Sequence, residues 1–432
     1  MARLDLCLFE PWQFAAADSG PSEWTRAVQR KSIPRLPQIF WNGGRGWAEP
    51  NLWALDEFVK PRAVEQTILT KMRHVLSYAN FLEENELDWR QFPMRVDERA
   101  LIKFRGCLLR KVEMGELAIT TATARMSAVI LFYRFAQSKN LVSTQVPMWE
   151  ERRVVVRYVD SVGFGRSMAR ASTDLHIPMR RRVGNSLEDG LYPLSATDVR
   201  ALFAYLKSNQ TTELALMLLI GLYTGARIGT ITTLGKRNLR AARPDPQLKD
   251  IHLIRIGPGT SVKTKFDVSG DLMVPTELLL RLVAYSESTE RLKREARADD
   301  KDKNILFLTR RAKRYSVNTV DRLVEKMRAE AIRQGLQFMD SFRFHQTRAT
   351  FGTQLMRMLL GVMSATNALD FVRSAMLHKS EATTMRYIKF IENSKAKQEL
   401  SREGLQNLSS IRLVRGLSVG DDGGHGSDHA RP

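Results

Sequence analysis

Two polar motifs lie close together in the stretch of sequence that decides the fold. Residues 345–387 read HQTRATFGTQLMRMLLGVMSATNALDFVRSAMLHKSEATTMRY. His345 and Arg348 are three positions apart, a spacing that places both side chains on one face of a helix. His378 precedes Tyr387 by nine residues. Hydroxyl residues that can cap a helix carrying the tyrosine lie between them, namely Ser380, Thr383 and Thr384.

A third motif, Thr224-Gly225-Ala226-Arg227, follows the longest apolar run of the chain, Leu214 to Tyr223. Gly225 can supply the left-handed turn that ends an apolar helix and brings Arg227 out of the core. A cation just beyond a buried helix requires an anion. Arg227 is therefore a candidate ligand for a negatively charged group.

Each motif alone has an ordinary structural explanation. A His-x-x-Arg pair is usually a solvated helix face, and a tyrosine in an apolar stretch is usually part of the core. The order and spacing of all the motifs together resemble those of the tyrosine recombinases, the phage integrase family. That family's pattern is an arginine box, a lysine hairpin, a His-x-x-Arg box, and a histidine followed nine residues later by the nucleophilic tyrosine. The resemblance covers residues 193–395 and, more loosely, 56–145.

The resemblance implies roles for these residues in DNA cleavage. The Tyr387 hydroxyl would attack a phosphodiester and form a 3'-phosphotyrosine with a free 5'-hydroxyl. Arg227 and Arg348 would bind the non-bridging oxygens, because guanidinium groups make paired, charge-assisted hydrogen bonds to them. His345 would accept the tyrosine proton, and His378 would donate a hydrogen bond to the phosphate. No metal ion, ATP or other cofactor is expected.

The family's lysine lies in a hairpin, and alternating apolar and polar residues predict a strand hairpin over 251–275. Lys263 is the expected general acid by its place at the end of the first strand, and Lys265 remains the alternative. The chain departs from the family pattern at Thr230, where an acidic residue is usual. It departs again at Leu377, where glycine usually precedes the histidine.

Periodicity and composition divide the chain into five parts. Periodicity predicts a mainly α fold with a small antiparallel β hairpin, and the resemblance implies a two-domain DNA clamp in which the catalytic domain is α+β. The expected parts are an N-terminal arm over 1–55, a helical (SAM-like) core-binding domain over 56–145, a basic linker over 146–192, a catalytic domain over 193–400, and a tail over 401–432 that is disordered from about 416.

The charge balance favours a polyanionic partner. The 432 residues include 67 Lys and Arg against 47 Asp and Glu, which gives a net charge of +20. Cys7 and Cys107 are too few for a disulfide framework or a four-ligand zinc site. No secretory signal precedes the first domain, and no apolar run is long enough to span a bilayer. We therefore expect a cytoplasmic protein that is nucleoid-associated when bound to DNA, with no membrane partner.

The expected function is a site-specific recombinase or integrase of mobile elements that acts on double-stranded DNA at a specific recombination site as a homotetramer. A type IB topoisomerase shares the tyrosine chemistry, but the separate helical domain favours recombination. A catalytically inactive DNA-binding protein is a second alternative, and the presence of every candidate catalytic residue argues against it. A metal-dependent nuclease would need clustered carboxylates, and no motif links the acidic residues.

Overall fold

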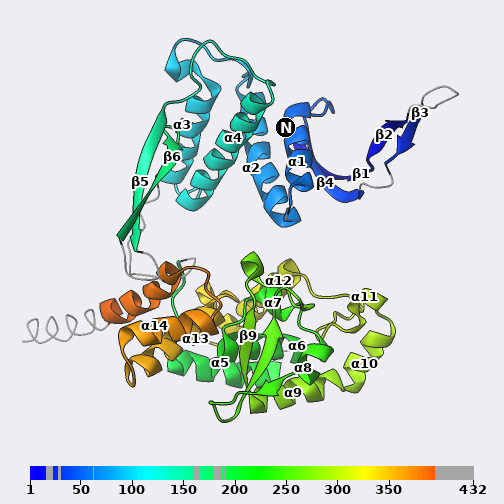
Figure 1. The fold of residues 1–432 in the computed structure, drawn as a ribbon, viewed down its shortest axis with the longest axis vertical. Coiled ribbons are helices and arrows are strands. Elements are labelled where there is room, and N and C mark those ends of the chain that lie inside the picture. The colour runs from blue at the N-terminus through cyan, green and yellow to red at the C-terminus, as the bar shows by residue number, and fades with distance from the viewer. Residues whose placement is uncertain are drawn as a thin grey trace, which may run out of the picture. The chain divides into compact units, whose positions relative to one another are not determined.

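The protein folds into two compact units, which a computed structural model describes over most of the chain (Figure 1). The units are Met1–Arg181 and Arg182–Pro432. The described residues are 1–15, 23–27, 31–61, 63–159, 165–178, 187, 190–209 and 211–394. The expected tail over 401–432 lies outside them. The expected fold class, mainly helical with small antiparallel sheets, is confirmed.

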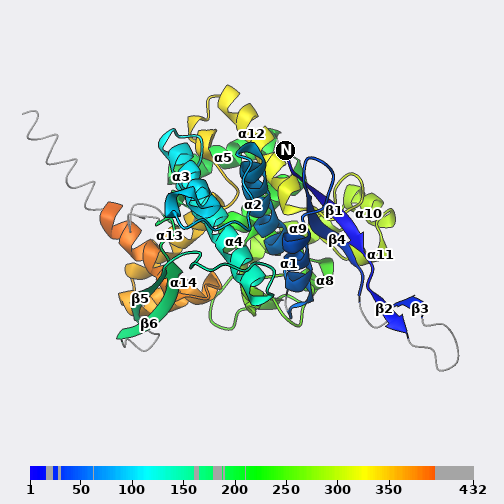
Figure 2. The ribbon, with the colours of Figure 1, turned by 90° about the horizontal axis from the view of Figure 1, so that it is seen from above.

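The first unit is built around four helices, and α2 and α4 lie side by side at its centre (Figures 1 and 2). The helices are α1 (Ala48–Val59), α2 (Glu65–Glu84), α3 (Ala100–Glu113) and α4 (Ile119–Ser138), with a short 3-10 helix at Val96–Glu98. Apolar residues recur every three or four positions along α2, including Ile68, Met72, Val75 and Ala79, and all four are buried. This stripe packs the helix onto its neighbours.

A large part of the expected N-terminal arm over 1–55 packs into this core, although Trp12, Phe14 and Trp24 are exposed. Strand β1 (Arg3–Phe9) pairs antiparallel with β4 (Ile33–Phe40), and a second ribbon joins β2 (Trp12–Ala15) to β3 (Glu23–Arg26). Ile39 and Trp47 are buried in the same cluster as α2. The Asn51 side chain accepts from the Ile39 N–H at 2.6 Å and donates to its carbonyl at 3.0 Å. Buried aromatic side chains hold this segment in place, and their positions follow no regular spacing in the sequence.

The segment expected to be a basic linker contains regular structure. Strands β5 (Glu151–Val159) and β6 (Gly165–Thr173) form an antiparallel ribbon in which Glu151 lies opposite Thr173. Leu175 and Ile177, just after the ribbon, are buried in the core of the first unit. The segment up to residue 178 therefore belongs structurally to the first unit.

The second unit combines helices with one three-stranded antiparallel sheet, ordered β7-β8-β9. The strands are β7 (Arg243–Pro244), β8 (Ile251–Ile256) and β9 (Gly270–Pro275). The helices are α5 (Ala196–Asn209), α6 (Thr212–Thr224), α7 (Ile228–Ile231), α8 (Lys236–Arg240), α9 (Thr276–Ser286), α10 (Thr289–Ala296), α11 (Asp300–Lys303), α12 (Val317–Arg333), α13 (Gln346–Leu360), α14 (Ala365–Ala375) and a helix over 381–394, with 3-10 turns at Lys265–Asp267 and Gln337–Ser341.

The predicted hairpin over 251–275 is confirmed. Strands β8 and β9 pair in an unbroken antiparallel register, from Ile251 opposite Pro275 to Ile256 opposite Gly270. The loop between the strands carries Lys263 and Lys265.

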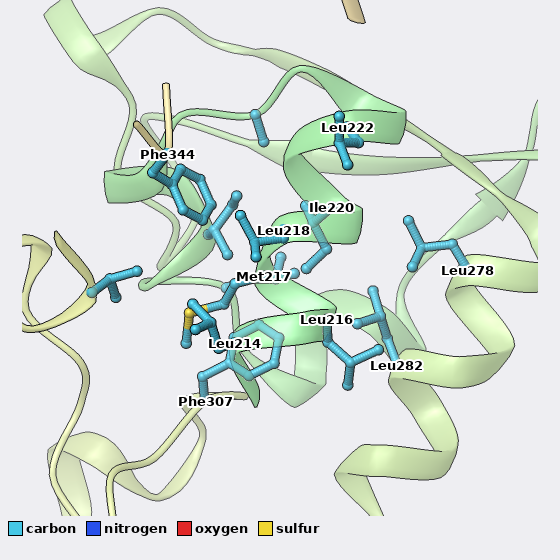
Figure 3. Packing of buried hydrophobic residues seen from close by; sticks show 14 of the residues in the cluster. Leu214, Leu216, Met217, Leu218, Ile220, Leu222, Leu278, Leu282, Phe307 and Phe344 are labelled. Atoms are coloured by element: carbon cyan, nitrogen blue, oxygen red, sulfur yellow. The ribbon is translucent and has the colours of Figure 1, made fainter. Parts of the chain in front are cut away.

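Helix α6 is the centre of the second unit, because it is apolar on nearly every face (Figure 3). Its buried side chains pack against α9 and the segments around Phe307 and Phe344. At Gly221 an added Cβ would lie 2.3 Å from the Thr347 Oγ1. This glycine therefore lets α6 and α13 pack at close range. The helix ends at Gly225, which adopts the predicted left-handed conformation with φ +64.

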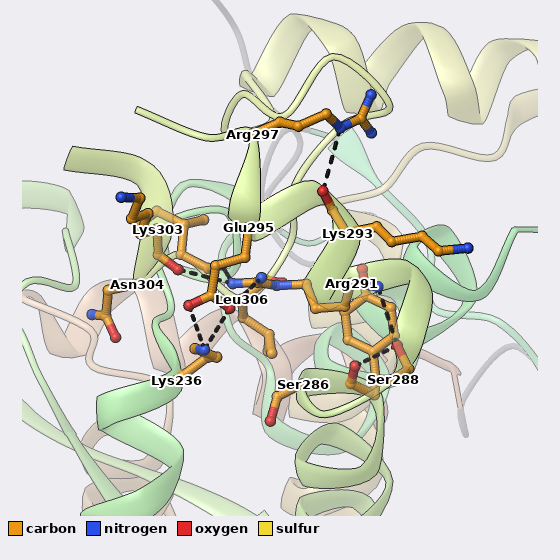
Figure 4. Close-up of polar contacts among 12 residues, drawn as sticks. Lys236, Ser286, Ser288, Arg291, Lys293, Glu295, Arg297, Lys303, Asn304 and Leu306 are labelled. Carbon is orange, nitrogen blue, oxygen red and sulfur yellow. Dashed lines mark hydrogen bonds and ion pairs between the residues drawn. The ribbon is translucent and has the colours of Figure 1, made fainter. Parts of the chain in front are cut away.

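The buried Arg291 of α10 connects this helix to the segment over 303–306 (Figure 4). Arg291 is 0% exposed and donates from Nε to the Leu306 carbonyl at 2.7 Å and from Nη2 to the Lys303 carbonyl at 3.1 Å. Its Nη1 donates to Glu295 Oε2 at 2.9 Å, and Lys236 contacts the same carboxylate. Burial alone would raise the pKa of Glu295, but the two cations outweigh it and hold that pKa below its ordinary value.

Candidate functional site

The His-x-x-Arg motif lies at the start of α13. His345 is the residue before the helix and already has helical dihedral angles, so it stands one turn from Arg348. His345 is half-buried, whereas Arg348 is only 2% exposed. The helical spacing predicted for this pair is therefore present in the structure.

The Arg348 guanidinium joins the three predicted motifs. Its Nη1 donates to the Gly225 carbonyl at 2.5 Å, and its Nη2 donates to the Met376 carbonyl at 2.7 Å. Gly225 ends α6 just before Arg227, and Met376 lies two residues before His378. Residues 123 and 28 positions away in the sequence are thereby fixed to one side chain. These bonds also fix the orientation of the guanidinium plane.

A small cavity lies beside this guanidinium, and both candidate phosphate ligands, Arg227 and Arg348, line it. Further lining residues come from the end of α6, the hairpin and the end of α14, namely Thr224, Gly225, Ala226, Thr230, Ile256, Thr264, Lys265, Val268, Leu272, Ala375, Met376 and Leu377. Two arginines beside one small cavity make this surface a candidate contact for an anionic group.

The two candidate lysines differ in their relation to this cavity. Lys265 is one of its lining residues. Lys263 lies two residues earlier, where its backbone N–H donates to the Thr233 hydroxyl at 3.0 Å. Both side chains are exposed. Lys265 therefore lines the same cavity as the arginines and Lys263 does not, although the sequence favoured Lys263.

Tyr387 and His378 are brought together by the helix over 381–394. Their rings are 6.0 Å apart between centroids and nearly parallel, at 23°. The His378 Nδ1 lies 2.9 Å from the Thr384 hydroxyl, which fixes the ring orientation. Thr384, predicted only as a possible helix cap, thus acts as a partner of the histidine. Only the presence of a hydroxyl group at position 384 could have indicated this contact before the structure was known.

The tyrosine ring packs into the body of the second unit. Tyr387 is 0% exposed and belongs to a cluster with Met376 and Ile388. A Cβ added at Gly352 of α13 would lie 2.6 Å from the Tyr387 Cε1 and 2.6 Å from the Met376 Sδ. Gly352 is therefore needed for space, a requirement that the sequence alone did not reveal.

The two departures from the family pattern both lie at the cavity. Thr230 and Leu377 are lining residues, and Thr230 is buried. Leu377 has a φ of +50, the left-handed conformation that glycine adopts without a steric penalty. The backbone shape expected of a glycine is thus kept although the residue is leucine.

The described residues contain neither a metal-binding cluster nor a membrane-spanning helix. Across those ranges no group of three or more His, Cys, Asp or Glu side chains is arranged to hold a metal ion. No helix within the part of the chain that the structure describes is long and apolar enough to cross a membrane.

Comparison with known proteins finds a family model that matches part of the second unit. Residues 193–393 match the model of the Phage integrase family. No curated protein matches the chain. A Tn1549 transposon integrase in complex with a circular intermediate DNA is similar in structure, with a TM-score of 0.50 at 13% identity over 81% of this chain and 98% of that chain. A lambda integrase dimer bound to a COC' core site gives a TM-score of 0.45 at 13% identity over 78% of this chain and 93% of that one.

Proposed function

We propose that this chain, whose residues 193–393 match the model of the Phage integrase family, is a tyrosine-type DNA recombinase. It would cleave and rejoin DNA at a specific site through a 3'-phosphotyrosine, with no metal ion or ATP. One observation carries the proposal. Arg227 and Arg348 line one cavity, and Arg348 is bonded to the backbone that leads directly into the His378 and Tyr387 segment.

The arginines would supply the charge that a metal ion supplies in other phosphoryl transfers. Attack on a phosphodiester places negative charge on the non-bridging oxygens, and oriented guanidinium groups stabilise that charge. Arg348 is held by two backbone carbonyls, so its orientation is set before DNA arrives. Preorganised donors need no rearrangement during the reaction.

Tyr387 would be the nucleophile. A bond forms between its oxygen and phosphorus while the bond from phosphorus to the 5' oxygen breaks. The phenol proton passes to His345, and the 5' oxygen takes a proton from a lysine. Since Tyr387 is buried in this structure, the helix over 381–394 has to shift to bring the hydroxyl to the phosphate. His378, held by Thr384, would donate a hydrogen bond to a phosphate oxygen.

The general acid would be Lys265 rather than Lys263. Its place among the cavity-lining residues supports this choice. Lys263 would then have a structural role, because its backbone N–H donates to the Thr233 hydroxyl and so holds the hairpin loop.

The proposal extends to the partners of the chain. The net charge of +20 suits double-stranded DNA as a partner, and the helical first unit would be the core-binding domain. Recombining two duplexes breaks four strands, and each tyrosine cleaves one. We therefore propose a homotetramer in the synaptic complex, acting on nucleoid DNA in the cytoplasm.

The decisive experiment captures the covalent intermediate. Wild-type protein and the Tyr387→Phe variant are incubated with nicked suicide DNA substrates and resolved on denaturing gels, with and without EDTA. We expect a covalent shift for wild type in both conditions and none for Tyr387→Phe. Tyr223→Phe is the matched control, because Tyr223 is 46% exposed on α6. A covalent shift by Tyr387→Phe, or loss of the wild-type shift in EDTA, would refute the mechanism.

Sequencing the captured DNA tests the class of enzyme. A single recurrent junction is expected of a site-specific recombinase. Covalent complexes scattered over many sequences would instead indicate a topoisomerase.

A sulfur substitution identifies the general acid. A thiol has a pKa near ~8.5 and leaves as thiolate, so DNA with sulfur at the bridging 5' position needs no acid. Lys265→Ala should lose about 10²- to 10⁴-fold on ordinary DNA and regain cleavage on the sulfur-bridged DNA. Lys263→Ala should cleave both substrates almost normally. The reverse pattern would return the role to Lys263.

A further inference from the structure

Helix α14 ends in a turn that determines where His378 begins. The His378 N–H donates to the Arg373 carbonyl at 3.0 Å, and the Leu377 N–H donates to the Ser374 carbonyl at 3.0 Å. These two bonds form a Schellman motif, in which the residue after the C-cap is left-handed and usually glycine. Here that residue is Leu377, with a φ of +50. A branched side chain in this conformation is strained relative to glycine.

The Leu377 side chain fills space that a glycine leaves open on the neighbouring strand. A Cβ added at Gly270, the first residue of β9, would lie 2.3 Å from the Leu377 Cδ2. The φ of Gly270 is outside the left-handed region. Position 270 therefore requires glycine for space and not for backbone conformation, and the space is occupied by Leu377.

This contact joins the hairpin that carries Lys265 to the segment that carries His378. Gly270 follows Lys265 by five residues, and Leu377 immediately precedes His378. Leu377 lines the cavity of the two arginines and also a neighbouring cavity that Gly270 and His378 line. A second contact joins the same segments, because the Lys379 Nζ lies 5.6 Å from the centre of the Phe266 ring.

We propose that Leu377 is a positioning residue for strand cleavage. Its backbone conformation sets the start of the His378 segment, and its side chain, packed over Gly270, holds the lysine hairpin against the cavity. This inference rests on the proposed function. It gives the departure from the family's glycine a role, since a glycine at position 377 would leave the hairpin without this contact.

The first test separates positioning from folding by means of the leaving group. Leu377→Gly relieves the left-handed backbone, so the thermal midpoint should change little. Covalent complex formation on ordinary DNA should slow by about 10- to 100-fold, the effect of misplacing a catalytic group by roughly 1 Å. On sulfur-bridged DNA the variant should approach the wild-type rate, because a misplaced acid no longer matters. Equal slowing on both substrates would overturn the proposal.

The second test moves the side chain to the other segment. Gly270→Val should slow cleavage because its side chain collides with Leu377. The double variant Gly270→Val with Leu377→Gly restores apolar volume to the contact, so it should cleave faster than the product of the two single effects predicts. Simple multiplication of the two losses would contradict a direct contact between these positions.

Ala312→Gly is the matched control for the effect of placing glycine at a strained, left-handed position. Ala312 is also left-handed, with a φ of +59, and lies in a separate buried cluster. Its replacement should leave cleavage of both substrates unchanged. Failure of the wild type to form a covalent complex on either substrate would refute the proposed function itself, and that result is distinct from any pattern among the Leu377 variants.

Discussion

Two arginines in the second unit are almost completely buried, at 0% exposed for Arg291 and 2% for Arg348, and their surroundings differ. Arg291 and Lys236 both contact the Glu295 carboxylate, and Arg291 also donates to the carbonyls of Lys303 and Leu306. Arg348 donates to the carbonyls of Gly225 and Met376 and lines a cavity.

The difference separates a structural arginine, Arg291, from the arginine that we propose to be functional, Arg348. A buried cation is costly unless it is paired, and a carboxylate at Arg291 compensates its charge locally. Arg348 is oriented by its bonds to two backbone carbonyls and lines a cavity that Arg227 also lines, and these two observations support the proposal that it binds the anionic substrate.

The largest expected effect concerns the structural arginine. Arg291→Met should lower the free energy of unfolding by about 3–5 kcal/mol, because Glu295 and several buried carbonyls lose their partner. The change is measured by urea unfolding. Arg297→Met at the exposed end of the same helix should change stability by less than about 0.5 kcal/mol. A small loss for Arg291→Met would show that water or Lys236 replaces the guanidinium.

The functional arginine should affect catalysis more than stability. Arg348→Lys keeps the charge but loses the planar fork, so covalent complex formation should fall about 10²- to 10³-fold. Unlike loss of the lysine acid, this defect should persist on sulfur-bridged DNA, since the non-bridging oxygens still carry charge. Arg357→Lys, on an exposed face of α13, is the control. Rescue of Arg348→Lys by sulfur would contradict its assignment as a phosphate ligand.

The lowered pKa of Glu295 predicts a pH dependence of stability. A carboxyl group whose folded pKa lies below its ordinary value of 4.5 stabilises the fold above that value, and the contribution is lost as pH falls through the folded pKa. Glu295→Gln should therefore cost about 1–3 kcal/mol at pH 7 and less in acid. Unfolding curves at both pH values measure this, with the exposed Glu290→Gln as control. If the loss of stability in Glu295→Gln instead grew on acidification, the pKa of Glu295 in the folded protein would lie above its ordinary value.

The smallest effect is expected at the histidine. Thr384→Val removes the hydroxyl that fixes His378 and should slow covalent complex formation by about 2- to 10-fold, the range for one neutral hydrogen bond. Thr383→Val keeps that partner and serves as the control. An identical slowing by both variants would mean that the helix over 381–394, and not the His378 bond, is sensitive to the substitution.

Local rules predicted the parts of the molecule that depend on local sequence. Gly225 ends α6 in the expected left-handed turn, and the strand hairpin over 251–275 has the expected pairing. The His-x-x-Arg spacing placed His345 and Arg348 one turn apart on α13. Each of these features follows from a period or a turn that a few neighbouring residues specify.

Features that depend on distant contacts were not predicted. Trp47 is buried by helices far along the chain, so a segment that looked irregular in the sequence packs into a core. The choice between Lys263 and Lys265 depends on the loop conformation, in which Phe266 and Asp267 are both left-handed. Gly352 is required by the Tyr387 ring, which contacts it from another helix. None of these relations leaves a periodic pattern.

The packing of Leu377 over Gly270 has an evolutionary consequence. A large side chain fits at one of the two positions only if the residue at the other is small. Substitutions at the two positions must therefore occur together during evolution. Related chains that carry glycine before the histidine should carry a larger residue at the strand position, and chains with a bulky residue there should keep a glycine in the strand. Positions 270 and 377, which lie 107 residues apart in the sequence, should therefore covary across the family.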